Sequence, residues 1–257
     1  RRTHYFSLYR FLDRIRILAS TVNVENSDRN VGSIRLEQLS SYLSKDSGKH
    51  LADGYQGSVD LYETPFGNYV VKRARGTFLW RLFGEAALRR EREIYARLQN
   101  VDGVPQCLGL LENKYLVLEH ISGQSYRSRQ HEIEDRGLFF DRLLKTLKGM
   151  HSVGVAHGDL KRKDNLLVGP NEQPFIIDFG LACLRQPYGK RLNRFYFGWL
   201  KQYDYNAWIK LKYQGRLESI AVDDLSLYRP MKLERIARII RIAWQKLTFR
   251  TYRTRHR

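Results

Sequence analysis

Two short motifs stand out in the sequence: HGDLKRKDNLLV at residues 157–168 and FIIDFG at residues 175–180. Each joins an apolar run, of the kind that forms a buried strand, to a group of acidic, basic and amide side chains. The oxygens of Asn165 and Asp178 are hard ligands that suit Mg²⁺, which keeps water and substrate phosphates in the rest of its coordination shell. A polar hairpin would not explain both motifs at this separation, so we interpret them as parts of one site.

A glycine-containing turn, GYQGSV at residues 54–59, comes just before a predicted strand. Gly54 and Gly57 lack a Cβ atom, so backbone N–H groups there could approach an anion closely. Taken alone, a pair of glycines before a strand is more often an ordinary turn. The turn is therefore a candidate anion cover only in combination with the other motifs.

Lys72 ends the next apolar run. A lysine at a strand end is usually solvated, and it lies inside a protein only when an anion pairs with it. The predicted helix over residues 82–99 offers three carboxylates that could orient the ammonium group, those of Glu85, Glu91 and Glu93. We interpret Lys72 as a functional cation and Glu91 as its candidate partner, with Glu85 and Glu93 as competitors.

These groups together match the requirements of phosphoryl transfer from ATP: a cover over the phosphates, a cation, metal ligands and a carboxylate near the acceptor hydroxyl. The glycine turn, Lys72 and the metal-binding oxygens would supply the first three. Asp159 would accept or orient the proton of the acceptor hydroxyl. Lys161 would neutralise charge on the phosphoryl group as it moves.

From about Leu51 to the C-terminus, the sequence resembles the protein-kinase-like superfamily. Residues 157–165 resemble the catalytic loop of that family, residues 178–180 resemble its metal-binding triplet, and residues 150–155 resemble the run before the loop. The resemblance implies an α+β fold of two lobes, a strand-rich N-lobe with one main helix and a helical C-lobe. It also implies ATP and Mg²⁺ as cofactors, with metal ligands in the two motifs quoted above.

The resemblance further implies how the nucleotide would be bound. The run of residues 118–121 is similar to the hinge of the family, so the Glu119 carbonyl and the Ile121 amide would bind adenine. Three apolar side chains would enclose the adenine ring. They are Val59, Val70 and Leu167. The helix pattern of the family favours Glu91 over Glu93 as the partner of Lys72.

Several positions depart from the pattern of the family. Ala52 stands where the first loop glycine is usual, and Gly158 replaces an arginine that couples the loop to a phosphorylated segment in many protein kinases. One extra residue separates Asp159 from Asn165, which makes Asp164 a rival metal ligand. No Ala-Pro-Glu run follows residue 180. This compact pattern is more similar to bacterial kinases of lipopolysaccharide core sugars (the Kdo and heptose kinase type), with small atypical protein kinases second.

The chain is strongly basic. Forty-five Lys and Arg residues against 27 Asp and Glu residues give a net charge of +18 and a pI near 10.0. This excess favours contact with a nucleic acid, an anionic membrane or a phosphorylated substrate. No apolar run is long enough to span a bilayer, no signal-peptide pattern is present, and the two cysteines form no framework. We therefore expect a cytoplasmic protein.

Two predicted helices, over residues 4–19 and 231–249, are amphipathic and basic. Helices of this kind can lie on an anionic membrane, which predicts peripheral contact with the inner face of the inner membrane. The alternative is that their apolar faces pack on the rest of the protein. The basic residues are dispersed and join no known nucleic-acid motif, so we expect no specific nucleic-acid partner.

The expected organisation is a helix and linker over residues 1–30, an N-lobe over residues 31–119 and a C-lobe over residues 120–257. Three functions are compatible with the sequence. The first is a kinase that acts on a sugar of the lipopolysaccharide core, and the second is a small protein serine/threonine kinase. The third is a nucleotide-binding pseudokinase or a nucleic-acid scaffold, which the complete set of catalytic groups disfavours.

Overall fold

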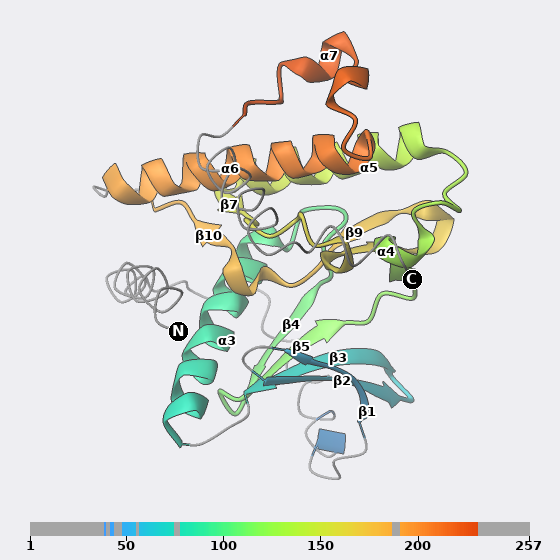
Figure 1. The fold of residues 1–257 in the computed structure, drawn as a ribbon. Helices are drawn as coiled ribbons and strands as arrows, with labels where there is room; N and C mark the ends of the chain where they lie inside the picture. Colours follow the sequence, from blue (N-terminus) through green and yellow to red (C-terminus); the bar gives the residue numbers. More distant parts are fainter. Residues whose placement is uncertain are drawn as a thin grey trace, which may run out of the picture. The chain divides into compact units, whose positions relative to one another are not determined.

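A computed structural model describes residues 39, 42–43, 48–54, 57–74, 78–186 and 191–230 (Figure 1). The chain divides into two units, Arg1–Ile34 and Arg35–Arg257, and every described residue belongs to the second unit. The amphipathic helices predicted over residues 4–19 and 231–249 lie outside the described residues. Within the described ranges, no helix is both long and apolar enough to cross a membrane.

The first part of the described chain forms a five-stranded antiparallel sheet in the order β1-β2-β3-β5-β4. The strands are β1 (Lys49–Gly54), β2 (Gly57–Thr64), β3 (Gly67–Ala74), β4 (Cys107–Leu111) and β5 (Tyr115–Glu119). Side chains alternate between the two faces of a strand, so Tyr69 and Val71 of β3 share one face and Val70 and Lys72 share the other. Tyr69 and Val71 are buried in an apolar cluster, which leaves Val70 and Lys72 on the face that carries the candidate site.

One helix, α3 (Phe78–Leu98), lies beside this sheet (Figure 1). Its buried stripe includes Glu91, Ile94, Tyr95 and Leu98, which recur at the spacing of one helix face. Among the side chains of α3 that the structure describes, Glu91 is therefore the one charged member of an otherwise apolar buried stripe.

The second part of the described chain is mainly helical. Its elements are β6 (Gln124–Ser125), α4 (Tyr126–Arg129), α5 (Arg136–Ser152), β7 (Val155–Ala156), β8 (Leu166–Val168), β9 (Pro174–Ile176), β10 (Cys183–Leu184), α6 (Arg191–Lys212) and α7 (Val222–Leu225). Helices α5 and α6 run side by side (Figure 1) and bury large side chains between them, with Trp208 Nε1 donating to the Phe140 carbonyl at 2.8 Å. The predicted α+β fold, strand-rich first and helical second, is confirmed.

Short strand pairs position both sequence motifs. Strands β7 and β10 pair through Ala156 and Cys183, and strands β8 and β9 pair through Leu166 and Ile176. Residues 157–165 connect β7 to β8, and residues 177–182 connect β9 to β10. The strands at the two ends of the first connection, β7 and β8, pair with the strands at the two ends of the second, β10 and β9. The polar residues of the two motifs therefore lie close together.

A substitution at Gly57 tests whether the close approach of strand β3 requires a glycine at this end of the turn. A Cβ atom on Gly57 would lie 1.8 Å from the Arg73 carbonyl oxygen in the paired strand β3. We expect Gly57→Ala to lower the free energy of unfolding by about 2 kcal/mol or more, because backbone cannot yield as a flexible side chain does. The measurement is urea denaturation without nucleotide.

Gly198→Ala is the matched control, because a Cβ atom on Gly198 in α6 would meet nothing within 4 Å. We expect that variant to be as stable as the wild type or more stable, since alanine favours a helix by about 1 kcal/mol over glycine. Equal stability of Gly57→Ala and the wild type would contradict this account of the turn.

Candidate active site

Lys72 joins three separate parts of the chain. Its Nζ atom lies 2.7 Å from Glu91 Oε1 on α3 and 3.1 Å from Asp178 Oδ1 after β9. Burial disfavours the charge on Lys72, but the two carboxylates outweigh it and raise the pKa of Lys72 above its usual value. Of the three glutamates considered for this pairing, Glu91 makes the contact, and Glu93 is exposed.

Asp178 is held in an uncommon backbone conformation, with φ 65° and ψ 75°. Non-glycine residues in this left-handed region are frequent at functional sites, where the surroundings fix them. Burial disfavours ionisation of Asp178, but Lys72 overcomes it and holds the pKa of Asp178 below its usual value. The next residue, Phe179, is buried against Tyr95 of α3 and His157, with ring centroids 5.1 and 5.0 Å away.

Helix α3 also contacts the chain after Asp178 through Arg90. The guanidinium of Arg90 donates to the carbonyl oxygens of Gly180 and Ala182. Neighbouring residues of one helix, Arg90 and Glu91, thus both bind the segment that carries Asp178, one directly and one through Lys72.

The backbone around Asp159 is fixed by two buried side chains. His157 Nδ1 accepts a hydrogen bond from the Asp159 N–H at 3.1 Å, which leaves Nε2–H to donate to the Ile177 carbonyl at 3.0 Å. Asp204 of α6 accepts from the N–H groups of His157 and Gly158, both at 2.8 Å. Partial burial raises the pKa of Asp159 itself, as suits a group that accepts a proton.

Asp204 was missed by the sequence analysis. It is fully buried and also lies 3.1 Å from His151 Nε2. The signal that could have found it is an aspartate on the apolar face of a helix, in the stripe that contains Phe197, Leu200 and Leu211. A buried carboxylate needs several donors, so its position in that stripe indicates a structural hydrogen-bond centre.

Asn165 and Asp164, the two rival metal ligands, have different surroundings. Asn165 is buried, and its Nδ2 donates to the Asp159 carbonyl at 3.0 Å and to Asp159 Oδ2 at 3.1 Å, which leaves its Oδ1 for another partner. Asp164 is bound by Arg127, with Nε 2.8 Å from Oδ1 and a terminal nitrogen 2.8 Å from Oδ2. Arg127 also holds the pKa of Asp164 below its usual value.

The oxygens of Asn165 and Asp178 are a donor set that fits Mg²⁺, which needs few protein ligands when substrate phosphates complete its shell. Among the described residues, no group of three His, Cys, Asp or Glu side chains could hold a metal without such help. Lys161, two residues after Asp159 in the loop, is exposed.

The predicted adenine contacts lie around the end of β5. Glu119 is paired with Tyr69 of β3, and the N–H of His120 donates to the Asn68 carbonyl at 3.3 Å. Within the described part of the chain, the Ile121 N–H donates to no backbone carbonyl. The apolar side chains expected to enclose the ring are all partly buried: Val59 opposite Lys72 in β2, Val70 in β3 and Leu167 in β8.

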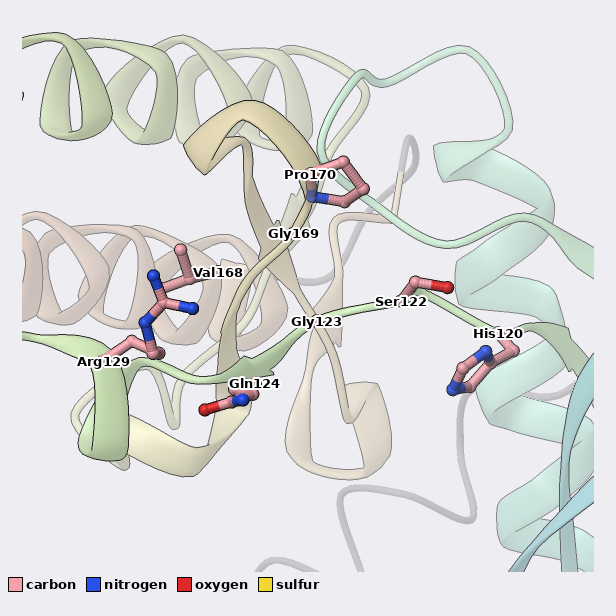
Figure 2. Close-up of a pocket in the computed structure, with 8 residues that line it drawn as sticks. All are labelled: His120, Ser122, Gly123, Gln124, Arg129, Val168, Gly169 and Pro170. Atoms are coloured by element: carbon pink, nitrogen blue, oxygen red, sulfur yellow. The ribbon is translucent and has the colours of Figure 1, made fainter. Parts of the chain in front are cut away.

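A cavity of about 370 Å³ opens next to the end of β5, lined by His120, Ser122, Gly123, Gln124, Arg129, Val168, Gly169 and Pro170 (Figure 2). A second cavity, of about 490 Å³, shares Arg129, Val168 and Gly169. None of the predicted adenine contacts lines either cavity. The candidate site lies at the ion pairs of Lys72 and not at these cavities, because only those ion pairs bring together the charged groups that phosphoryl transfer needs.

Removing the Asp204 carboxylate tests its hold on the catalytic loop. Asp204→Ala leaves the N–H groups of His157 and Gly158 without this acceptor and removes the contact with His151, so we expect it to lower the free energy of unfolding by about 3 kcal/mol or more. Asp204→Asn keeps one acceptor oxygen and should fall between that variant and the wild type. Chemical denaturation measures this, with Asp223→Asn as the control because Asp223 is exposed. A loss no larger than that of the control would remove Asp204 from this role.

The similarity of this chain to known proteins includes both sequence motifs. The family model described as protein kinase domain matches residues 70–199. A probable serine/threonine-protein kinase, fnkB of Dictyostelium discoideum, is 31% identical over 106 residues, which are 38% of this chain and 20% of that protein. The mitogen-activated protein kinase mpkC of Aspergillus oryzae is 36% identical over 104 residues, which are 38% of this chain and 30% of that protein.

The matched part of the chain thus spans less than a third of the length of these two relatives. Among solved structures, the kinase domain of PF14_0431 has a TM-score of 0.45 at 20% identity and covers 55% of this chain and 52% of its own. These findings do not support the narrower likeness to kinases of the lipopolysaccharide core. The family model covers just over half of the chain, from β3 through the catalytic loop into α6, so this chain belongs to the protein kinase domain family, whose members use ATP and Mg²⁺.

Proposed function

We propose that this chain is a protein serine/threonine kinase, which transfers the γ-phosphoryl group of ATP to a hydroxyl group of a protein. The observation that carries the proposal is the contact of Lys72 with both Glu91 and Asp178, at 2.7 and 3.1 Å. It brings the cation for the phosphates and a candidate metal ligand into one site. The named relatives are protein kinases, which favours a protein over a sugar as the acceptor.

Bound ATP and Mg²⁺ would supply the activated phosphoryl group and neutralise its charge. In the proposed site, Lys72 binds phosphate oxygens while Glu91 fixes the position of its ammonium group. Asn165 and Asp178 offer amide and carboxylate oxygens to the metal. Gly54 and Gly57 provide backbone N–H groups above the phosphates.

The acceptor side of the proposed site is formed by the catalytic loop. Asp159 Oδ2 is bound to Asn165 Nδ2, so Oδ1 is the atom that receives or orients the hydroxyl proton. Lys161 carries a positive charge two residues further on and neutralises charge on the phosphoryl group.

The Glu119 carbonyl and the Ile121 N–H bind adenine between the apolar side chains of β2, β3 and β8.

A sugar of the lipopolysaccharide core is the second candidate acceptor. The feature that favours it is the short connection after Gly180, since α6 already begins at Arg191. Peripheral membrane contact belongs with that alternative and stays a prediction, because the helices that suggested it lie outside the described residues.

The test is to incubate the full chain with γ-labelled ATP, Mg²⁺, a protein fraction and a glycolipid fraction, and to determine which acceptor carries the label. We expect label on serine or threonine of protein, and none with Asp159→Asn. Label on glycolipid alone would favour the sugar kinase. ATP binding without transfer to either fraction would indicate a pseudokinase and contradict the proposal.

The two aspartates of the site should fail in different ways. Asp178→Ala removes a metal ligand, so we expect it to weaken the binding of Mg·ATP. Asp159→Ala should spare nucleotide affinity and lower kcat by about 10²-fold to 10⁴-fold, the usual contribution of a general base. Nucleotide titration and steady-state kinetics of both variants decide this, and an equal loss of ATP affinity in both would overturn the assignment.

The surroundings of Asn165 and Asp164 predict a ranking of two further variants. We expect Asn165→Ala to raise the Mg²⁺ concentration required for half-maximal activity by about tenfold or more, as loss of a metal-site group does. Asp164→Ala should change that concentration little, because its carboxylate is bound by Arg127. A Mg²⁺ titration of the reaction rate compares them, and the reverse ranking would make Asp164 the ligand.

A further inference from the structure

The loop that carries Asp159 also carries three successive cations. Lys161 and Arg162 are exposed, and within the described part of the chain neither makes a hydrogen bond or an ion pair through its side chain. Lys163 Nζ donates to Gln130 Oε1 at 2.6 Å, and this amide oxygen carries no charge. No carboxylate of the described chain forms an ion pair with any of these three side chains, although Arg162 interacts electrostatically with Asp159 and Asp164.

The one acid in this part of the loop is already occupied. Asp164 makes a two-pronged contact with Arg127, and both partners are partly exposed. The positive charge of Arg127 balances the negative charge of Asp164, so Asp164 is not available to attract a basic substrate. The sequence from residue 179 to residue 203, which follows Asp178, contains no aspartate or glutamate and several basic residues.

Backbone turns keep Arg162 close to Asp159. The Arg162 N–H donates to the Asp159 carbonyl at 3.2 Å, and the Arg162 carbonyl accepts from the Asn165 N–H at 3.0 Å. Residues 159–165 are therefore folded into two consecutive tight turns, and Arg162 stands where they meet. Burial raises the pKa of Asp159, and the positive charge of Arg162 partly offsets this rise. Arg162 is therefore close enough to the Asp159 carboxylate to interact with it electrostatically.

We propose that the acceptor hydroxyl belongs to an acidic segment of protein and that Arg162 and Lys163 determine this specificity. The inference rests on the proposed protein kinase function and narrows its substrate class. Acidic side chains next to the acceptor would lie beside cations that make no ion pair within the described chain, whereas basic side chains would be repelled. The extra residue in this loop, relative to the family pattern, lengthens the stretch that holds these cations.

The experiment compares three serine peptides that differ only in the flanking residues, which are Asp and Glu, Gln and Ala, or Lys and Arg. An exposed ion pair changes an equilibrium or a rate by up to about fivefold, so several acidic residues should raise kcat/KM by about tenfold or more over the neutral peptide. The preference should shrink as salt screens the charges. The ratio of kcat/KM between peptides does not depend on the fraction of enzyme that is folded.

Arg162→Glu should reduce or reverse the preference, and Arg162→Lys should keep it. Lys148→Glu is the matched control, because it makes the same change of charge at an exposed residue of α5 and should leave the preference unchanged. A wild-type enzyme that prefers neutral or basic peptides would overturn the inference and leave the protein kinase proposal standing. Phosphorylation of glycolipid with no labelling of any peptide would overturn both.

Discussion

The rest of the site depends on the largely buried ammonium group of Lys72. Lys72 lies on the inner face of the sheet, where its charge is disfavoured unless anions surround it. Glu91 and Asp178 provide that compensation from a helix and from a loop about 100 residues further along the chain. Removing one of these carboxylates leaves the largely buried ammonium group with less compensation, so the sheet, α3 and the loop that carries Asp178 are constrained together.

The loop that carries Asp159 is held by a second set of contacts. Asp204 binds two backbone N–H groups of the loop, and His157 connects the loop to Ile177, the residue before Asp178. Phe179 packs between α3 and His157, so both sets meet at one aromatic side chain. This arrangement uses only contacts within the chain. It gives a physical reason why Gly158, in place of the usual arginine, is compatible with an ordered loop.

The fold class and the residue types of the site could be predicted from the sequence because they depend on local patterns. Alternating apolar residues predict the strands, and Asp159, Asn165 and Asp178 stand in recognisable motifs. The choice of Glu91 over Glu93 comes from the helix pattern of the family, and in the structure Glu91 lies in the buried stripe of Ile94 and Leu98.

The remaining features depend on contacts between distant parts of the chain, which no local pattern shows. Asp204 binds a loop more than 40 residues before it, and the partner of Asp164, Arg127, lies on α4. The contact of Arg127 with Asp164 bears on two proposals. It occupies both carboxylate oxygens of Asp164, which favours Asn165 as the metal ligand, and it leaves the neighbouring cations without an ion pair to Asp164.

The central claim is that Glu91 positions Lys72 to bind the phosphates of ATP. Calorimetric titration of Glu91→Gln with Mg·ATP tests it most directly, with Glu93→Gln as the control because Glu93 is exposed on the same helix. The account predicts that Glu91→Gln remains folded by circular dichroism and binds ATP about tenfold or more weakly, while Glu93→Gln binds like the wild type. Unchanged ATP affinity in a folded Glu91→Gln protein, or an equal loss in both variants, would contradict it.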